Sequence, residues 1–362
     1  MAYTTIDDPT QYFNTVLYTG DLQDSDGTGH TQSITGVGFQ PDWVWHKGRS
    51  GARTHLLVDR VRGVSSYNWI ASNSNGAELT TNTNGAISSI DSDGITVQNG
   101  NDSSSKSNNA GKNGETWVFW NWLAGGSASS NSDGSITSSV SANTTAGFSI
   151  VSYTGTGSAA TVGHGLGAAP KMFIVKNRDS TESWRVYHNA LGATKEIYLD
   201  LSNAVGTSSS SFNDTEPTSS VFSVGTGNGT NKSSENLIAY CFAEKKGYSK
   251  IGSYTGNGNA DGPFVYTGFK PAWILLKQSS ASGAGWRIHD TKRGISGNPE
   301  DETLYASASN AESTGRDVDF LSNGFKLRTD SGDGNSSGST YIYMAFAESP
   351  FVNSNGVPCN AR

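Results

Sequence analysis

The sequence predicts an all-β protein built of three tandem β-sandwich repeats with few helices. Three observations support this fold class. The 362 residues include 44 Gly, well above the usual share. One pattern of motifs occurs three times along the chain. Short apolar runs are separated by turn residues about every 8–12 positions, which is typical of β-sandwiches.

Each repeat opens with Tyr-Thr-Gly, at residues 18–20, 153–155 and 254–256. A Gly-rich stretch follows, and then a proline leads a short apolar run that ends in a lysine six residues later. The prolines are Pro41, Pro170 and Pro271, and the lysines are Lys47, Lys176 and Lys277. Proline is tolerated at the start of a strand because its missing N–H is not needed there. These runs are therefore predicted to be buried strands.

A second motif is shared by two repeats. Asp59-x-x-Arg62-Gly recurs as Asp290-x-x-Arg293-Gly, whereas the second repeat has His188 and Leu191 at these places. An internal ion pair that pins a turn is predicted, and its absence from one copy favours a structural role. Tryptophans at recurring places are predicted to pack in the core; these are Trp43, Trp184, Trp273 and Trp286.

Aromatic-rich strands close the repeats at 116–123, 237–244 and 341–348. The predicted organisation is an N-terminal arm (1–17), repeat 1 (18–126), a flexible linker (127–147), repeat 2 (148–247), repeat 3 (248–352) and a C-terminal tail (353–362). A pseudo-threefold unit and a row of tandem beads both remain open.

Composition excludes several classes of partner. The net charge is -7 and no long Lys/Arg cluster is present, which argues against nucleic acid. The sequence has no apolar run of about 18 residues, so membrane insertion is not expected. It also has no apolar leader segment, so export is not expected. Cys241 lies in an apolar run and is predicted to be buried and inert, so with Cys359 it forms no disulfide framework or zinc site.

No catalytic residue or cofactor is predicted, because metalloprotease, Walker and nucleophile-elbow motifs are absent from the sequence. The loop at 163–167 leads into a strand, whereas phosphate cradles lead into a helix. Carboxylates of the third repeat have no equivalents in the second, so solvated loop acids are favoured over a glycosidase pair. They are Glu300, Asp301, Glu302, Asp317 and Asp319. His46, His188 and His289 are predicted as satisfied residues of core strands.

Two ligand sites are weaker hypotheses. Loop aspartates could supply oxygen ligands to calcium, although a turn role explains Asp93-Gly94 equally well. The candidates are Asp24, Asp26, Asp91, Asp93, Asp330 and Asp333. Aromatic residues outside the repeat consensus are predicted to be exposed and to stack on a glycan. These are Tyr67, Trp69, Trp120 and Trp122.

The combination of Tyr-Thr-Gly, Gly-Phe-x-Pro-x-Trp, Asp-x-x-Arg-Gly and a closing Ala-Phe-Ala-Glu resembles a repeat of uncharacterised structural proteins of tailed bacteriophages, particularly marine ones. The third repeat matches most literally. The first departs most, because it ends in Trp-Asn-Trp-Leu. The resemblance implies a virion component with a jelly-roll or concanavalin-like sandwich, and it transfers no catalytic residues.

The expected function is a non-enzymatic virion structural protein, made in the host cytoplasm and displayed on the particle as a capsid decoration or a head or tail appendage. No collagen-like or heptad stalk is present, which disfavours a complete fibre. The alternatives are a tail-fibre or spike adhesin that binds host surface glycan, and a polysaccharide depolymerase. Expected partners are other virion proteins, through the N-terminal arm; a homo-oligomer and a host glycan are further candidates.

Overall fold

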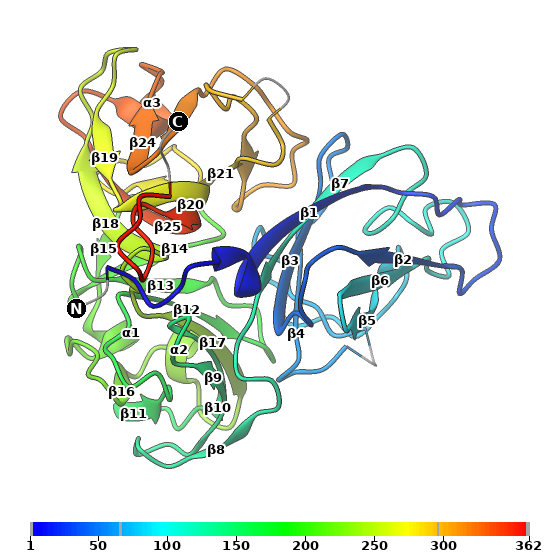
Figure 1. Ribbon diagram of the computed structural model, residues 1–362. Coiled ribbons are helices and arrows are strands. Elements are labelled where there is room, and N and C mark those ends of the chain that lie inside the picture. Colours follow the sequence, from blue (N-terminus) through cyan, green and yellow to red (C-terminus); the bar gives the residue numbers. More distant parts are fainter. Residues whose placement is uncertain (1–2, 65–66, 295–296, 360–362) are drawn as a thin grey trace.

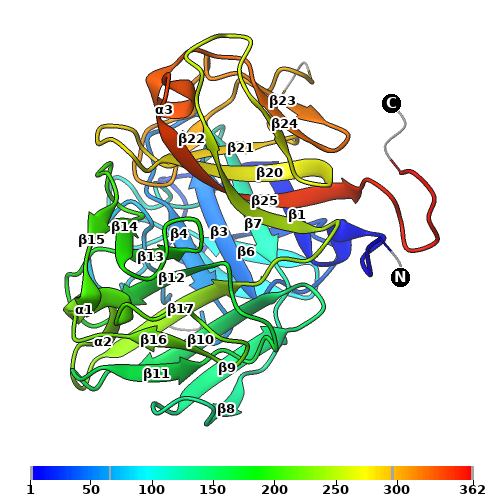
Figure 2. The same cartoon turned by 90° about the vertical axis from the view of Figure 1, so that its left-hand side faces the viewer.

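The computed structural model describes residues 3–64, 67–294 and 297–359 and confirms an all-β fold. The helical segments of these residues are only three or four residues long: η1 (Pro9–Gln11), α1 (Ser209–Phe212), α2 (Asn228–Asn231) and α3 (Gly332–Asn335). The three repeats form three lobes around a common centre rather than a row (Figures 1 and 2).

Each repeat contains a large antiparallel sheet, here called its inner sheet, with the same strand order. The first strand pairs with the closing strand, which pairs with the proline-led strand, which pairs with a fourth strand. In repeat 1 these are β1 (Phe13–Thr19), β7 (Thr116–Trp122), β3 (Trp43–Gly48) and β4 (Leu56–Asp59). In repeat 2 they are β10 (Phe148–Thr154), β17 (Asn236–Phe242), β12 (Met172–Asn177) and β13 (Arg185–His188). In repeat 3 they are β18 (Ser249–Thr255), β25 (Thr340–Pro350), β20 (Phe269–Gln278) and β21 (Arg287–Asp290).

A smaller outer sheet covers one face of each inner sheet. Its strands are β2 (Thr31–Thr35), β5 (Ala86–Asp91) and β6 (Gly94–Gln98) in repeat 1; β11 (Ala160–Gly163) and β16 (Val221–Val224) in repeat 2; and β19 (Phe264–Tyr266), β23 (Val318–Leu321) and β24 (Gly324–Leu327) in repeat 3. Each repeat has its own apolar core that includes residues of both sheets. Each repeat is therefore a sandwich.

The other faces of the inner sheets meet in one central core, a single cluster of buried side chains drawn from all three repeats. Corresponding residues of the closing strands lie together there. The Phe346 ring centroid is 5.7 Å from that of Trp122 and 6.0 Å from that of Phe242. The four recurring tryptophans, Trp43, Trp184, Trp273 and Trp286, are at most 1% exposed, as predicted. The arrangement is pseudo-threefold, and both faces of each inner sheet are buried, which explains their continuous apolar runs.

The predicted linker is wrong, because it contains strands. Within 127–147 lie β8 (Ser129–Asn131) and β9 (Ser138–Asn143), and β9 pairs along β10. The backbone N–H and C=O groups of this serine-rich segment can pair with the edge of a sheet whatever its side chains are. Three short strands, β14 (Lys195–Tyr198), β15 (Gly206–Thr207) and β22 (Leu304–Tyr305), extend the inner sheets at their other ends.

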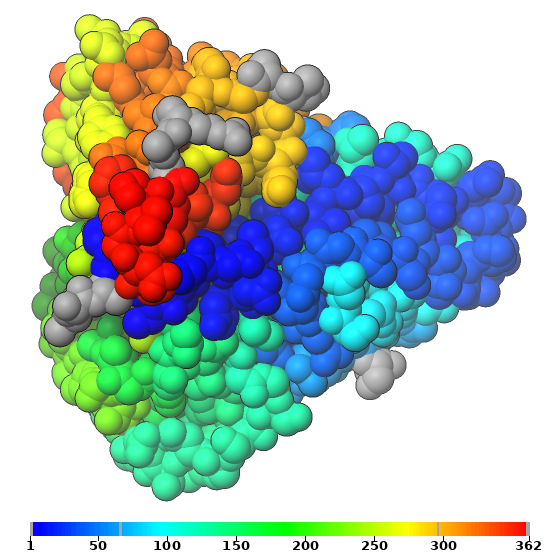
Figure 3. Space-filling model, viewed as in Figure 1, coloured from blue at the N-terminus to red at the C-terminus, as the bar shows by residue number. Residues whose placement is uncertain are grey.

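Much of the predicted N-terminal arm (1–17) is also part of the fold. Strand β1 begins at Phe13, inside the predicted arm, and Ile6 and Phe13 are each 2% exposed in the central core. Asp7 accepts hydrogen bonds from Ser354 near the other end of the chain. The space-filling view shows both terminal segments lying over the place where the lobes meet (Figure 3). Apolar residues in the arm bury surface here, so it is not a free tether.

Buried histidines are expected to make the fold sensitive to acid. Burial lowers the pKa of His46 to about 3 and of His188 to about 4, and lowers those of His55 and His289 well below the usual value. The unfolded chain binds protons below about pH 6.5, whereas the folded state does not, so stability is present above pH 6.5 and is lost as the pH falls. We expect urea midpoints to decline between pH 6.5 and 4, with uptake of about four protons by these histidines on unfolding near pH 5. A flat profile over this range would contradict the assignment.

Candidate functional site

The Asp-x-x-Arg-Gly motif forms the joint between repeats 1 and 2. Asp59 Oδ2 lies 2.5 Å from Arg62 Nε, and both side chains are fully buried, so the predicted ion pair is confirmed. Arg62 also pairs with Glu78, which pairs with Arg178 of repeat 2 at 2.7 Å. The Tyr240 hydroxyl of repeat 2 donates to Asp59 at 2.8 Å. The pair therefore joins two repeats as well as pinning a turn.

The same network recurs between repeats 3 and 1. Asp290 Oδ2 lies 2.5 Å from Arg293 Nε, again with both side chains fully buried. Arg293 pairs with Glu312, and Glu312 pairs with Arg49 of repeat 1 at 2.8 Å. Trp120 of repeat 1 donates its indole N–H to Asp290 at 2.9 Å. Trp120 thus occupies the place that Tyr240 takes at the first joint.

At the joint between repeats 2 and 3, a histidine replaces the aspartate of the ion pair. His188 occupies the position of the aspartates, as strand register shows, since it lies opposite Met172 where Asp59 lies opposite Trp43. Its Nε2 is 3.2 Å from the Tyr343 carbonyl oxygen of repeat 3. The three repeats thus contact one another at three equivalent joints. Two of these joints contain a buried ion pair, and the third contains a histidine in its place.

Two further sets of equivalent residues reach across the joints. The three repeated lysines are fully buried, and each ammonium lies at a carbonyl of the neighbouring repeat: Lys47 at Ser309, Lys176 at Asn75 and Lys277 at Ser202, over 3.0 to 3.5 Å. Burial lowers the pKa of Lys47 to about 7 and those of Lys176 and Lys277 to about 8. The second set consists of three aromatic side chains whose ring N–H groups donate to backbone carbonyl oxygens of the neighbouring repeat. These hydrogen bonds run from Trp184 to Ala71, from Trp286 to Tyr198 and from His55 to Tyr305. The repeated polar residues therefore connect repeats.

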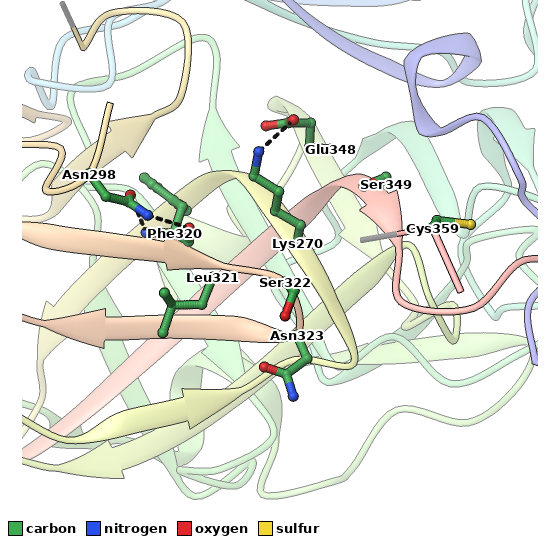
Figure 4. A pocket seen from close by; sticks show the side chains of 9 residues that line it. All are labelled: Lys270, Asn298, Phe320, Leu321, Ser322, Asn323, Glu348, Ser349 and Cys359. Carbon is green, nitrogen blue, oxygen red and sulfur yellow. Dashed lines mark hydrogen bonds and ion pairs between the residues drawn. The ribbon is translucent and has the colours of Figure 1, made fainter. Parts of the chain in front are cut away.

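A surface groove of about 630 Å³ lies on repeat 3 (Figure 4). It is lined by Lys270, Asn298, Phe320, Leu321, Ser322, Asn323, Glu348, Ser349 and Cys359. Lys270 pairs with Glu348 at 2.8 Å, and the Asn298 side chain bonds both the N–H and the carbonyl of Phe320. The charged pair and the Asn298 amide therefore have partners within the protein.

The prediction that the acids of the third repeat are solvated is wrong for Glu300. This side chain lies next to the groove and is 4% exposed, and its Oε2 has no hydrogen-bond partner in the described part of the chain. Burial, followed by the nearby Glu302 and Asp290, raises the pKa of Glu300 to about 7. Asp319, in contrast, lies 3.5 Å from Arg328 in an ion pair.

Glu300→Gln is expected to stabilise the protein at pH 8 and to leave it unchanged at pH 5. A carboxyl with a raised folded pKa contributes its stability fully below about pH 4.5 and loses it as the pH rises through 7. The neutral amide avoids that loss, so we expect a gain of about 1–2 kcal/mol at pH 8 in urea unfolding. Glu348→Gln, at the surface, is the control and is expected to stay within about 0.5 kcal/mol. Equal effects of Glu300→Gln at both pH values would refute the explanation.

The predicted exposure of aromatic residues in repeat 1 is wrong for its tryptophans. Trp120 and Trp122 are fully buried because the closing strand of repeat 1 is covered on both faces, and Trp69 is 7% exposed in the sandwich core of repeat 1. Tyr67 is half-buried and donates its hydroxyl to Gln98. Exposed aromatic rings occur instead on β19, where Phe264 is 45% and Tyr266 56% exposed. The alternation of Phe264-Val-Tyr266 was the signal in the sequence.

The candidate calcium ligands are mostly engaged by protein donors. Asp93 accepts from the N–H groups of Gly36 and Gly38, as a turn role requires, and Asp333 pairs with Arg316. Asp24 accepts from Ser107, Asp26 from Gln23, and Asp91 from Ser89 and Thr96, while Asp330 is exposed. Across residues 3–64, 67–294 and 297–359, no group of three or more His, Cys, Asp or Glu side chains is placed to hold a metal ion.

The remaining candidates have structural surroundings. Cys241 is fully buried, as predicted, and burial raises the pKa of its thiol. His164, in the loop at 163–167, is buried with its Nε2 3.1 Å from the Thr218 carbonyl oxygen. Among the described helices, none has the length and apolar character needed to span a bilayer.

Comparison with known proteins gives one match. The model of a family described as a domain of unknown function, DUF7483, matches residues 8–350. Neither the curated proteins nor the solved structures contain a match. The matched range covers all three repeats, so the family unit corresponds to the whole pseudo-threefold body rather than to one sandwich.

Proposed function

The chain belongs to the DUF7483 family, whose function is unknown, and we propose that it is a non-enzymatic structural protein of a tailed-bacteriophage virion. It would be displayed on the outside of the particle, as a capsid decoration or a head or tail appendage. The resemblance of its motifs to repeats of phage structural proteins supports the virion setting. One observation carries the structural role: the polar residues that recur among the repeats are buried at the joints between them.

The polar residues that recur among the repeats are the residues at which a shared chemistry would be expected. Here the paired Asp59–Arg62 and Asp290–Arg293 side chains are fully buried, and so are the three lysines. None of these groups can meet a substrate. They hold three sandwiches as one rigid body, which suits a protein that must survive outside the cell.

The arm is occupied within the fold, so contacts with other virion proteins would fall on the outer faces of the repeats. Three similar lobes around one axis would let a single chain occupy a site of local threefold symmetry. This favours a decoration at such an axis over a link in a fibre.

Immunoelectron microscopy of purified particles tests the proposal. An antibody against the folded protein should label intact virions. Label over the head supports a decoration, and label confined to the tail supports an appendage. Absence of the protein from purified particles, in both microscopy and mass spectrometry, would refute the virion role.

An adhesin that binds host surface glycan is the second candidate. It is favoured by one specific observation, the exposed aromatic pair Phe264 and Tyr266 on the outside of repeat 3.

A further inference from the structure

We propose that repeat 3 binds a polysaccharide through Phe264, Tyr266 and the pocket beside Tyr266. The inference names the binding site that the adhesin alternative would need. It rests on the proposed function only for the source of the polysaccharide, the host surface. Binding itself can be measured on the purified protein, whether or not the protein is part of a virion.

Strand β19 presents two aromatic rings to solvent on one face. Phe264 and Tyr266 are the only exposed Phe, Tyr or Trp side chains among the described residues, at 45% and 56%, whereas Val265 between them is 6% exposed in the core of repeat 3. Side chains two residues apart on a strand share a face and lie about 6.6 Å apart. The strand lies at the edge of its sheet, on the outside of the lobe (Figure 1). Two such rings form a platform on which the C–H faces of sugar rings can stack.

A pocket of about 570 Å³ adjoins this platform at Tyr266. It lies where the N-terminal arm, the junction between repeats 2 and 3, and the end of β19 come together. Tyr3 on its wall is held in place, since its hydroxyl donates to the Gly268 carbonyl at 2.6 Å and lies 3.5 Å from the Tyr266 hydroxyl. The Lys246 ammonium is 4.5 Å from the centre of the Tyr3 ring. The volume is within the usual range for small-ligand sites.

The charges around the pocket favour a hydroxyl-rich ligand. Glu244 and Lys250 both line it and pair with each other at 3.3 Å, and Lys246 lies against Tyr3. Carboxylate oxygens and ammonium groups can accept from and donate to sugar hydroxyls without demanding a charged partner. Aromatic faces beside a few convergent polar groups are the combination that a pyranose chain matches.

The test is binding of the purified full-length chain to a printed array of bacterial O-antigens and capsular polysaccharides, followed by calorimetry on the glycans that bind. The double variant Phe264→Ala/Tyr266→Ala should lose about four- to hundredfold in affinity, because each stacked ring contributes roughly two- to tenfold. Both side chains are exposed, so thermal stability should be unchanged. Leu79→Ala removes an equally exposed apolar side chain (44%) from repeat 1 and should bind as the wild type does.

Three outcomes would overturn the proposal: no array glycan bound by the wild type, equal binding by the double variant, or dimerisation through this surface that the double variant abolishes. The last would identify a second copy of the chain as the occupant. None of these outcomes depends on where the protein lies on a particle, so failure here and failure of the virion role are distinguishable.

Discussion

Replacing Trp43 with alanine is expected to lower the free energy of unfolding by about 3–5 kcal/mol and to weaken all three repeats together. The Trp43 side chain is fully buried. Its ring centroid lies 4.4 Å from Trp122 of its own repeat and 4.4 Å from Tyr240 of repeat 2. The cavity left by the substitution therefore opens into the central core, where the repeats have no separate boundary.

Urea unfolding and amide hydrogen exchange measure the effect. A shared core predicts one transition at a lower urea concentration, with faster exchange in the inner sheets of all three repeats. Leu17→Ala, at an exposed position, is the control and should stay within about 0.5 kcal/mol. Two transitions, with exchange accelerated in repeat 1 alone, would contradict the idea of a common core.

Arg293→Leu is expected to cost about 3–5 kcal/mol, because it leaves the Asp290 carboxylate buried without its cation. Both side chains are fully buried, and Arg293 also holds Glu312 at the joint with repeat 1. The indole N–H of Trp120 and the backbone N–H groups of residues 292 and 293 would remain as donors to Asp290, but neutral hydrogen bonds do not replace the lost positive charge. Urea unfolding gives the magnitude.

The second repeat supplies a matched control for this experiment. It carries His188 and Leu191 where repeat 3 carries Asp290 and Arg293. The double variant Asp290→His/Arg293→Leu removes the unpaired carboxylate and should recover part of the stability lost by Arg293→Leu. Lys270→Met breaks a half-exposed surface pair and should cost no more than about 1 kcal/mol. If the double variant is no more stable than the single one, unpaired charge is not the cause.

Repetition and strand periodicity determined much of the fold in advance. The proline-led runs, the closing strands and the core positions of Trp43 and Trp273 could be predicted because each depends on a local pattern that the chain repeats. The Asp–Arg pairs could be predicted for the same reason, since a spacing of three residues suffices to bring them together.

Which surfaces of the repeats meet could not be predicted, because it depends on contacts between residues far apart in the chain. Trp120 departs from the consensus and yet is buried, because the inner face of repeat 1 lies against repeat 3. Residues 127–147 are polar and yet contain strands, because the edge of β10 lies beside them. The burial of Glu300 likewise depends on neighbours distant in the chain. Local sequence patterns were sufficient to predict the sandwich repeat and its internal ion pairs. The closed ring of three was decided only in three dimensions, because burial at a joint depends on the opposing repeat.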